Sequence, residues 1–296
     1  MPTSQPKDKY PKPQNEAGFK GPVRWLLGPQ LIASLKWTVL YAAFKGKLDP
    51  RDWMRAQPIS LGENRFNSAD GVPDDEYWFD YFADTGDGQL AMYSIAYLCF
   101  SNLWVGADVH VGSEVELTET SETTMKLPRG EFLFVGGDTA YHMADYPTLA
   151  LRFQAPFRWA FEDLKEESRI SDSGPRRPLF GIPGNHDYYD LIDGFGRQFV
   201  EPTSEEDQEN REGLRPQLSI PGFKRRQTAS YIALTLPFDW YLWGLDNEIG
   251  RLDIRQQEFF KALGSKRPDK LIVATPEPTT ALGQRAKPDG KSCEGI

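Results

Sequence analysis

Two short motifs of chemically active residues each follow a strand-like run of the sequence. Residues 136–138 read Gly-Gly-Asp and come directly after residues 131–135, whereas residues 184–187 read Gly-Asn-His-Asp and follow residues 178–183. A run that stops at such a motif is typical of an open α/β sheet, which carries ligand-binding side chains at the carboxyl ends of its strands. Carboxylate, amide and imidazole groups gathered there favour metal-assisted chemistry on phosphoesters.

The segments that must position these motifs alternate between strand-like and helix-like from residue 77 onward, which predicts an α/β fold with a buried sheet. The predicted strands are residues 77–83, 131–135, 178–183, 228–236, 240–245 and 270–275, and the predicted helices are residues 90–100, 146–164 and 253–263. Phe153, Phe157 and Phe161 recur at four-residue intervals, so we expect them on the buried face of the second helix.

The composition is that of a folded protein, with 296 residues of which 39% are hydrophobic. A formal net charge of -9 argues against a broad nucleic-acid surface, which needs a basic face. It leaves room for a small phosphorylated substrate whose charge a metal ion neutralises. The two cysteines, Cys99 and Cys293, lack zinc-type spacing, so we expect no disulfide framework and a cytoplasmic location.

Four regions are predicted along the chain. They are a disordered tail at residues 1–21, a helical extension at 22–70, the main domain at 71–281 and an unstructured tail at 282–296. The first tail is rich in Pro, Lys and Gln and lacks the apolar core of a signal peptide. Nothing in it directs export.

The helical extension contains a predicted helix over residues 30–44. Polar residues interrupt this stretch, and it is too short to span a bilayer. We expect it to pack on its own domain; the alternative is an interfacial membrane helix carrying Trp25 and Trp37. Membrane association is therefore not favoured.

The two motifs resemble those of the calcineurin-like metallophosphoesterases. The similarity covers roughly residues 78–278, and the Gly-Asn-His-Asp motif at 184–187 is specific when a strand precedes it. The resemblance implies a metallophosphoesterase-like sandwich of two mixed β-sheets flanked by helices, with two divalent metal ions at the strand ends. It also implies a metal-dependent phosphoester hydrolase that acts on a small phosphorylated substrate or a phosphoprotein.

The resemblance assigns a role to each residue of the two motifs. Asp138 would bridge the two metal ions, and Asn185 would bind one of them through its neutral amide oxygen. His186 would lie beside the phosphate as proton donor or charge stabiliser, supported by Asp187. A simple turn would explain the Gly and Asn of the second motif but not all four of its residues.

The first metal motif of this family is Asp-x-His after a strand, and the chain offers two candidates. Asp84 follows a strand and precedes a helix, but glycine stands at the histidine position, and Asp87 could supply a replacement oxygen ligand. Asp108 and His110 match the residue types of the Asp-x-His motif, yet the sequence after them is typical of an extended segment. We favour Asp84, because the motif needs a strand-turn-helix context; residues 83–88 also resemble a divergent branch of the family with Ala-Asp-Thr-Gly-Asp-Gly there.

Family members complete both metal sites with a histidine after a late strand and a Gly-His-x-His element. Here the late strand leads to Glu277, and the only histidines are His110, His142 and His186. Three explanations remain open: the chain is a piece of a longer enzyme, it binds metal through oxygen ligands alone, or it is a non-catalytic module with the same fold. Oxygen ligands favour Mn²⁺, Mg²⁺ or iron over Zn²⁺. The expected ligands are Asp84, Asp87, Asp138, Asn185 and Glu277.

Two further residues lie close to the predicted site. His142 follows the first motif by a few residues, and we expect it to be a polar residue at a helix start rather than a ligand. Asp246 follows a predicted strand and lies at the sheet edge that could support the site.

Overall fold

The fold is mixed α/β, as predicted, with sheets of parallel and antiparallel strands flanked by helices. The computed structural model describes residues 10–24, 32, 35–36, 38–39, 42–43, 49–62, 72, 74–106, 124–171, 174–201, 218–248, 252–264, 269–276, 280–281 and 284–285.

Two four-stranded sheets form the centre of the molecule. The first has the order β2 (Asp80–Phe82), β5 (Leu133–Val135), β6 (Arg177–Gly181) and β7 (Phe223–Arg225), with every neighbouring pair parallel. The second has the order β1 (Ile59–Ser60), β8 (Ile232–Thr235), β9 (Trp240–Gly244) and β10 (Lys270–Ala274), with β8 and β9 antiparallel. Two small antiparallel pairs join β3 (Leu103–Gly106) to β4 (Thr124–Leu127) and β11 (Thr280–Ala281) to β12 (Gln284–Arg285).

The helices connect these strands. The α-helices are α2 (Gln89–Cys99), α3 (Tyr146–Leu149), α4 (Ala155–Glu166), α5 (Asn185–Tyr188), α6 (Asp193–Phe199) and α8 (Ile254–Gly264). Short 3-10 turns lie at η1 (Glu16–Gly18), η2 (Pro50–Trp53) and η5 (Pro237–Asp239). The single helix predicted over residues 146–164 is divided by a π-helical turn, η4 (Ala150–Gln154). Pro156 explains the division, because it lacks the amide that would bond to the carbonyl of Arg152.

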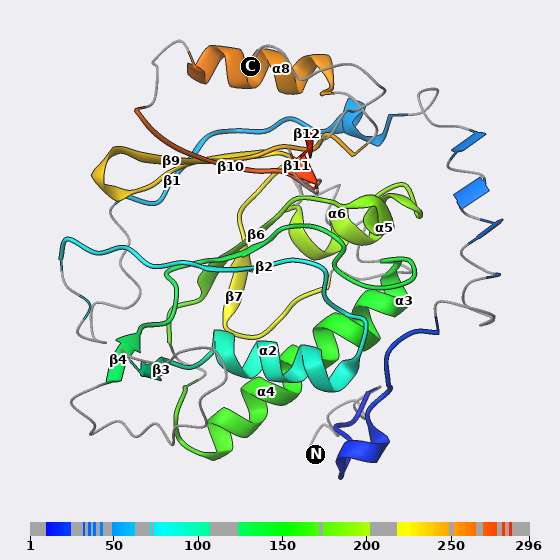
Figure 1. Cartoon of the computed structure of the whole chain (residues 1–296), viewed down its shortest axis with the longest axis vertical. Coiled ribbons are helices and arrows are strands. Elements are labelled where there is room, and N and C mark those ends of the chain that lie inside the picture. The colour runs from blue at the N-terminus through cyan, green and yellow to red at the C-terminus, as the bar shows by residue number, and fades with distance from the viewer. Residues whose placement is uncertain are drawn as a thin grey trace, which may run out of the picture.

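The elements stack in four layers, which Figure 1 shows edge-on. In β5, Leu133 and Val135 face the core under α2 and α4, whereas Phe134 faces the second sheet. Successive strand residues point to opposite faces, so a strand buried on both faces shows no polar alternation. Helix α8 covers the outer face of the second sheet through Phe260, which packs with Ala233. The order is therefore helices, sheet, sheet, helix.

The segment at residues 10–24 lies against α2 and α4, although most of it was expected to be disordered. The amide of Lys20 donates to Oε1 of Gln89 at 2.8 Å, and the amide of Gln89 donates back to the Lys20 carbonyl at 3.0 Å. The indole of Trp159 donates to the carbonyl of Tyr10 at 2.9 Å. Composition does not reveal these bonds, because they use the backbone of the segment.

In the stretch predicted as a helix over residues 30–44, the described residues are helical. Their apolar side chains are exposed, at 72% for Ile32, 58% for Leu35 and 59% for Val39, so these three do not pack on the domain. Among the described residues, no helix has both the length and the apolar character required to cross a bilayer. The predicted tail from residue 282 falls outside the described part of the chain, except for the two residues of β12.

The two sheets approach each other closely at Gly244, and replacing this residue with alanine should destabilise the protein. A Cβ there would lie 2.8 Å from Ile182 and 2.9 Å from both Ile232 and Phe134. We expect Gly244→Ala to lower the free energy of unfolding, measured by urea denaturation, by about 1–3 kcal/mol. The control is Gly196→Ala in α6, where a Cβ would meet nothing within 4 Å. Equal stability of the two variants would contradict this account of the sheet contact.

Candidate functional site

Three parallel strands bring Asp84, Asp138 and the residues at 184–187 to one edge of the first sheet. In the strand pairing, Phe82 lies opposite Val135, and Val135 lies opposite Gly181, so β2, β5 and β6 reach the same level at their carboxyl ends. Asp84 follows the first of these strands and Asp138 follows the second. The residues at 184–187 follow the third strand and begin the short helix α5.

Glycines allow the turns after these strands to touch. A Cβ on Gly184 would lie 2.3 Å from Oδ1 of Asp138, and one on Gly137 would lie 2.9 Å from the amide nitrogen of Gly184. Asp84 and Asp138 both adopt left-handed backbone conformations, with φ of 55° and 48°. Such conformations are costly for residues other than glycine and gather at functional sites. The backbone conformation at these two residues therefore sets the direction in which both carboxylates point.

The hydroxyl of Tyr141 joins the two carboxylates. It lies 2.8 Å from Oδ1 of Asp84 and 3.2 Å from Oδ2 of Asp138. Burial, together with these two carboxylates, raises the pKa of Tyr141. Burial also raises the pKa of Asp138, although the hydrogen bond from the His186 amide, at 3.0 Å, opposes the change. Apart from its position three residues after Asp138, nothing in the sequence indicated Tyr141.

The terminal amide of Asn185 lies between Asp138 and Tyr189. One of its two polar atoms is 3.2 Å from Oδ2 and 3.3 Å from Oδ1 of Asp138, and the other is 3.0 Å from the Tyr189 hydroxyl. With its nitrogen toward Asp138, the amide donates to the carboxylate and accepts from Tyr189. With its oxygen toward Asp138, two oxygens face each other, an arrangement that a shared cation stabilises. The orientation with nitrogen toward Asp138 gives both polar atoms of the amide a hydrogen-bond partner.

His186 is held by its neighbours on three sides. Its Nδ1 contacts the carbonyl oxygen of His142. Its ring meets the rings of Tyr141 and Tyr189 edge to face, with centroids 4.5 and 5.0 Å away. The Nδ1 contact fits a tautomer in which that nitrogen donates and Nε2 accepts. His142 itself contacts the N-terminal segment, with Nε2 3.2 Å from the carbonyl of Arg24.

Asp187 is fully buried beneath the turns. Its Oδ2 accepts from the amide of Gly184 at 2.9 Å and from the amide of Thr139 at 3.3 Å, so it ties the second motif to the first. Its Oδ1 has no hydrogen-bond partner among the described residues. Burial raises the pKa of Asp187 to about 7. Asp187 therefore supports both turns from the buried side.

The structure does not bring Asp87 to this cluster. Its Oδ1 accepts from the amide of Val23 at 2.7 Å, so it anchors the N-terminal segment. Gly86, which stands where the family has histidine, has φ of 71°, and a Cβ there would lie 2.6 Å from the carbonyl oxygen of Thr139. The backbone of the next turn therefore fills the space that a histidine side chain would need. Three other candidates, Glu277, Asp108 and His110, lie outside the described residues.

A buried ionic network supports the site from the second sheet. Asp246, at the end of β9, is 0% exposed and accepts from the Tyr188 hydroxyl at 2.8 Å through each oxygen. The equally buried Arg51 donates to the Asp246 carbonyl at 2.8 Å. Burial raises the pKa of Asp246 to about 6, with Arg51 opposing the change. Because Tyr188 belongs to α5, this network fixes the helix that carries Asn185 and His186. The sequence indicated Asp246 by its place after a strand, but nothing indicated Arg51.

Three oxygen-bearing side chains at this edge, Asp84, Asp138 and Asn185, are candidates to hold a metal ion. Among the described residues, no three His, Cys, Asp or Glu side chains group closely enough to hold a metal ion. The two carboxylates of Asp84 and Asp138 do meet, and the Asn185 amide reaches the second of them. These oxygen donors fit one hard cation such as Mg²⁺ or Mn²⁺, which also takes water ligands.

Comparison of the chain with protein-family models, with curated proteins and with solved structures gave no match.

The raised pKa of Asp187 should make stability depend on pH. Between about pH 4 and pH 7 the folded chain keeps a proton on this carboxyl that the unfolded chain has lost. The free energy of unfolding should therefore fall as pH rises through this range, by up to about 1.4 kcal/mol per pH unit for one proton. Asp187→Asn cannot ionise, so its stability relative to the unchanged protein should increase as pH rises from 4 to 7.

Urea denaturation at several pH values measures this difference. The matched control is Glu258→Gln on the exposed surface of α8, which also replaces a carboxyl with an amide. Its stability curve should run parallel to that of the unchanged protein. A parallel curve for Asp187→Asn would show that this carboxyl is ionised in the folded chain.

Proposed function

We propose that the chain is a metal-dependent phosphoester hydrolase of the calcineurin-like metallophosphoesterase type. The observation that carries the proposal is the convergence on Asp138, which shares the Tyr141 hydroxyl with Asp84 and lies next to the amides of Asn185 and His186. These groups come from three separate strands, as a site assembled at a sheet edge requires.

The layered architecture supports this proposal. Two four-stranded sheets packed face to face, with helices outside, agree with the sandwich that the resemblance implies. The strand directions differ in part, because the sheet that carries the site is parallel throughout its described strands. A fold of this kind hosts many functions, so the argument for function rests on the site.

In the proposed site, Asp84, Asp138 and Asn185 would hold a divalent cation through oxygen atoms. Such an ion, Mn²⁺, Mg²⁺ or iron rather than Zn²⁺, would supply positive charge and Lewis acidity toward a phosphate group. A second ion, which the family resemblance implies, would draw on Glu277. The proposed substrate is a small phosphorylated molecule or a phosphoprotein, and the proposed location is the cytoplasm.

His186 is the residue proposed to move a proton. Its Nδ1 lies against a backbone carbonyl, so Nε2 is the nitrogen that can accept a proton and return it to a leaving group. Tyr141 and Tyr189 fix the plane of the ring through edge-to-face contacts. Asp187 acts indirectly. It holds the two turns that position Asp138 and His186.

A second candidate function is a non-catalytic module with the same fold. Two observations favour it: the Tyr141 hydroxyl already joins the carboxylates of Asp84 and Asp138, and the Thr139 carbonyl fills the space of the absent histidine side chain. Such a module would fold normally and bind few metal ions. The two functions therefore differ in metal content as well as in turnover.

Hydrolysis of p-nitrophenyl phosphate and of bis(p-nitrophenyl) phosphate, with each divalent ion in turn, tests the enzymatic proposal. We expect activity that requires added Mn²⁺ and disappears with EDTA. Asp138→Asn and Asn185→Ala should lower kcat/KM by about 100-fold or more, because each removes an oxygen ligand from the site. Elemental analysis should find less bound metal in both variants.

The control is Asp269→Asn, which changes an exposed residue just before the amino-terminal end of β10. It should keep full activity and full metal content. A correctly folded chain that hydrolyses neither compound with any divalent ion, and that binds no metal, would instead establish the non-catalytic module.

A further inference from the structure

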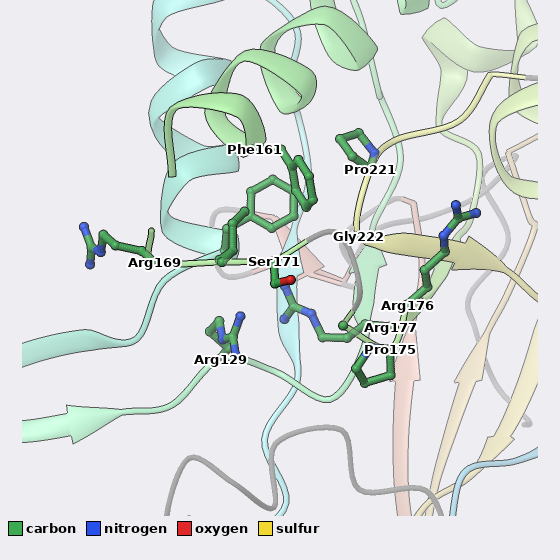
Figure 2. Close-up of a pocket in the computed structure, with 12 residues that line it drawn as sticks. Arg129, Phe161, Arg169, Ser171, Pro175, Arg176, Arg177, Pro221 and Gly222 are labelled. Carbon is green, nitrogen blue, oxygen red and sulfur yellow. The ribbon is translucent and has the colours of Figure 1, made fainter. Parts of the chain in front are cut away.

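Two cavities of different chemistry lie away from the candidate site, toward the amino-terminal ends of β2 and β6. The first has a volume of about 310 Å³ and four arginines in its lining (Figure 2). Two of these arginines are already paired, because Arg177 lies 3.2 Å from Asp80 and Arg169 lies 3.7 Å from Glu167. Figure 2 also shows Arg169 and Arg176 directed away from the centre of the cavity. The second cavity, of about 320 Å³, differs in being lined by aromatic side chains from both sheets.

This second space, which we call the aromatic cavity, has four aromatic rings and a carboxylate among its lining groups. The rings are those of Tyr77, Phe79, Phe238 and Trp240, and the carboxylate is that of Asp75. The first two rings belong to the segment that leads into β2, whereas the last two belong to the turn that leads from β8 into β9. In Figure 1 these segments lie on the left, and α5 of the candidate site lies on the right. The aromatic cavity is therefore separate from the candidate site.

The rings on the side of the first sheet are held in place by Phe132, which is fully buried. The ring of Phe79 stacks on that of Phe132, with centroids 4.9 Å apart and planes within 2° of each other. The ring of Tyr77 lies 6.3 Å from the same ring, at an angle of 40°. Because Phe132 orders both rings, a ligand entering the cavity would not have to order them.

The opposite side of the cavity is a turn with an unfavourable backbone conformation. Phe238 and Asp239 both adopt left-handed conformations, with φ of 60° and 61°, and such positions usually hold glycine or asparagine. The side chains of Phe238 and Trp240 are nevertheless 43% and 40% exposed. Lys270 stabilises the turn by donating to the Phe238 carbonyl at 3.1 Å. A ring this exposed offsets little of the strain by packing, and strain of this kind gathers at functional sites.

The chemistry of the lining groups favours an organic cation. The face of an aromatic ring carries partial negative charge and attracts a cation held within about 6 Å of the ring centre. Several rings around one space suit a quaternary ammonium group, which has no hydrogen to donate and presents only methyl groups and charge. The exposed carboxylate of Asp75 adds a negative charge beside the rings. The volume of about 320 Å³ also falls within the range of about 300–1,000 Å³ that is usual for small-molecule sites.

We infer that the aromatic cavity binds a small organic cation of the quaternary ammonium class. The positive head of the ligand lies among the four rings, with Asp75 at their edge. A neutral apolar group would also bury surface against these rings, so dependence on the ligand's charge is the property that distinguishes a cation site. The same head group occurs in free choline and in phosphatidylcholine. Binding here requires neither a metal ion nor the proposed hydrolytic activity, because the cavity and the candidate site lie apart.

Isothermal titration calorimetry of the full chain with choline tests this inference. We expect saturable binding at one site. The neutral isostere of choline, in which a tert-butyl group replaces the trimethylammonium group, should bind at least about 10-fold more weakly. Trp240→Leu should weaken choline binding roughly 5–20-fold, whereas Trp240→Phe keeps a ring and should restore most of the affinity. The matched control is Trp53→Leu, which changes a tryptophan that is 78% exposed in η2 and should bind choline normally.

The contribution of charge is measured with Asp75→Asn, which alters an exposed residue and should leave the fold intact. This variant should bind choline more weakly than the unchanged chain, and the difference should shrink as the salt concentration rises. Glu258→Gln, which removes an exposed carboxylate on α8, should bind choline normally. Thermal melting verifies that each variant is folded.

Three outcomes would overturn the inference. They are no saturable binding at millimolar choline, equal binding of choline and its neutral isostere, and equal binding of choline by folded Trp240→Leu and the unchanged chain. If Trp240→Leu does not fold, the isostere and Asp75→Asn still decide the question. Once choline binding is measured, cosedimentation with phosphatidylcholine vesicles identifies the source of the head group. A chain that pellets with vesicles and is released by free choline binds a lipid head group, and one that stays in solution binds a free molecule.

Discussion

The close contact between the turns after β5 and β6 is the constraint on which the rest of the site depends. Gly184 lies so near Asp138 that a single Cβ would reach its carboxylate, and Gly137 lies as near to Gly184. Only backbones without side chains can approach this closely. That approach places the His186 amide on Asp138 and the Asp187 carboxylate under both turns. The packing of three parallel strands therefore determines how the polar side chains of the site are arranged.

Several carboxyl groups in and around the site are buried. Asp138, Asp187 and Asp246 all have raised pKa values, and in each case desolvation is the principal cause. A protein keeps such groups inside only when backbone amides, hydroxyl groups or a cation compensate them. Here the Gly184 amide serves Asp187, and Tyr188 and Arg51 serve Asp246. For Asp138, the compensating groups are the Tyr141 hydroxyl and the His186 amide.

The two edges of the parallel sheet carry opposite electrostatic character. Carboxylates gather where β2, β5 and β6 end, whereas arginines gather where β6 begins. Asp80 and Arg177, at the first positions of their strands, form an ion pair at 3.2 Å on the basic edge. Between the two edges the central strand is apolar and buried, with Leu133, Phe134 and Val135 all 0% exposed.

The sequence by itself determined the α/β class, six of the eight strands in the two central sheets and the edge where Asp84, Asp138 and Asn185 meet, because apolar runs that end in Gly-Asp or Gly-Asn are local patterns. It did not predict that Asp87 would bind Val23, that residues 10–24 would lie against α2, or that Tyr141 would join two carboxylates. The network of Arg51 with Asp246 was equally hidden. These contacts join residues far apart in the chain, and only tertiary packing decides which distant side chains share a space.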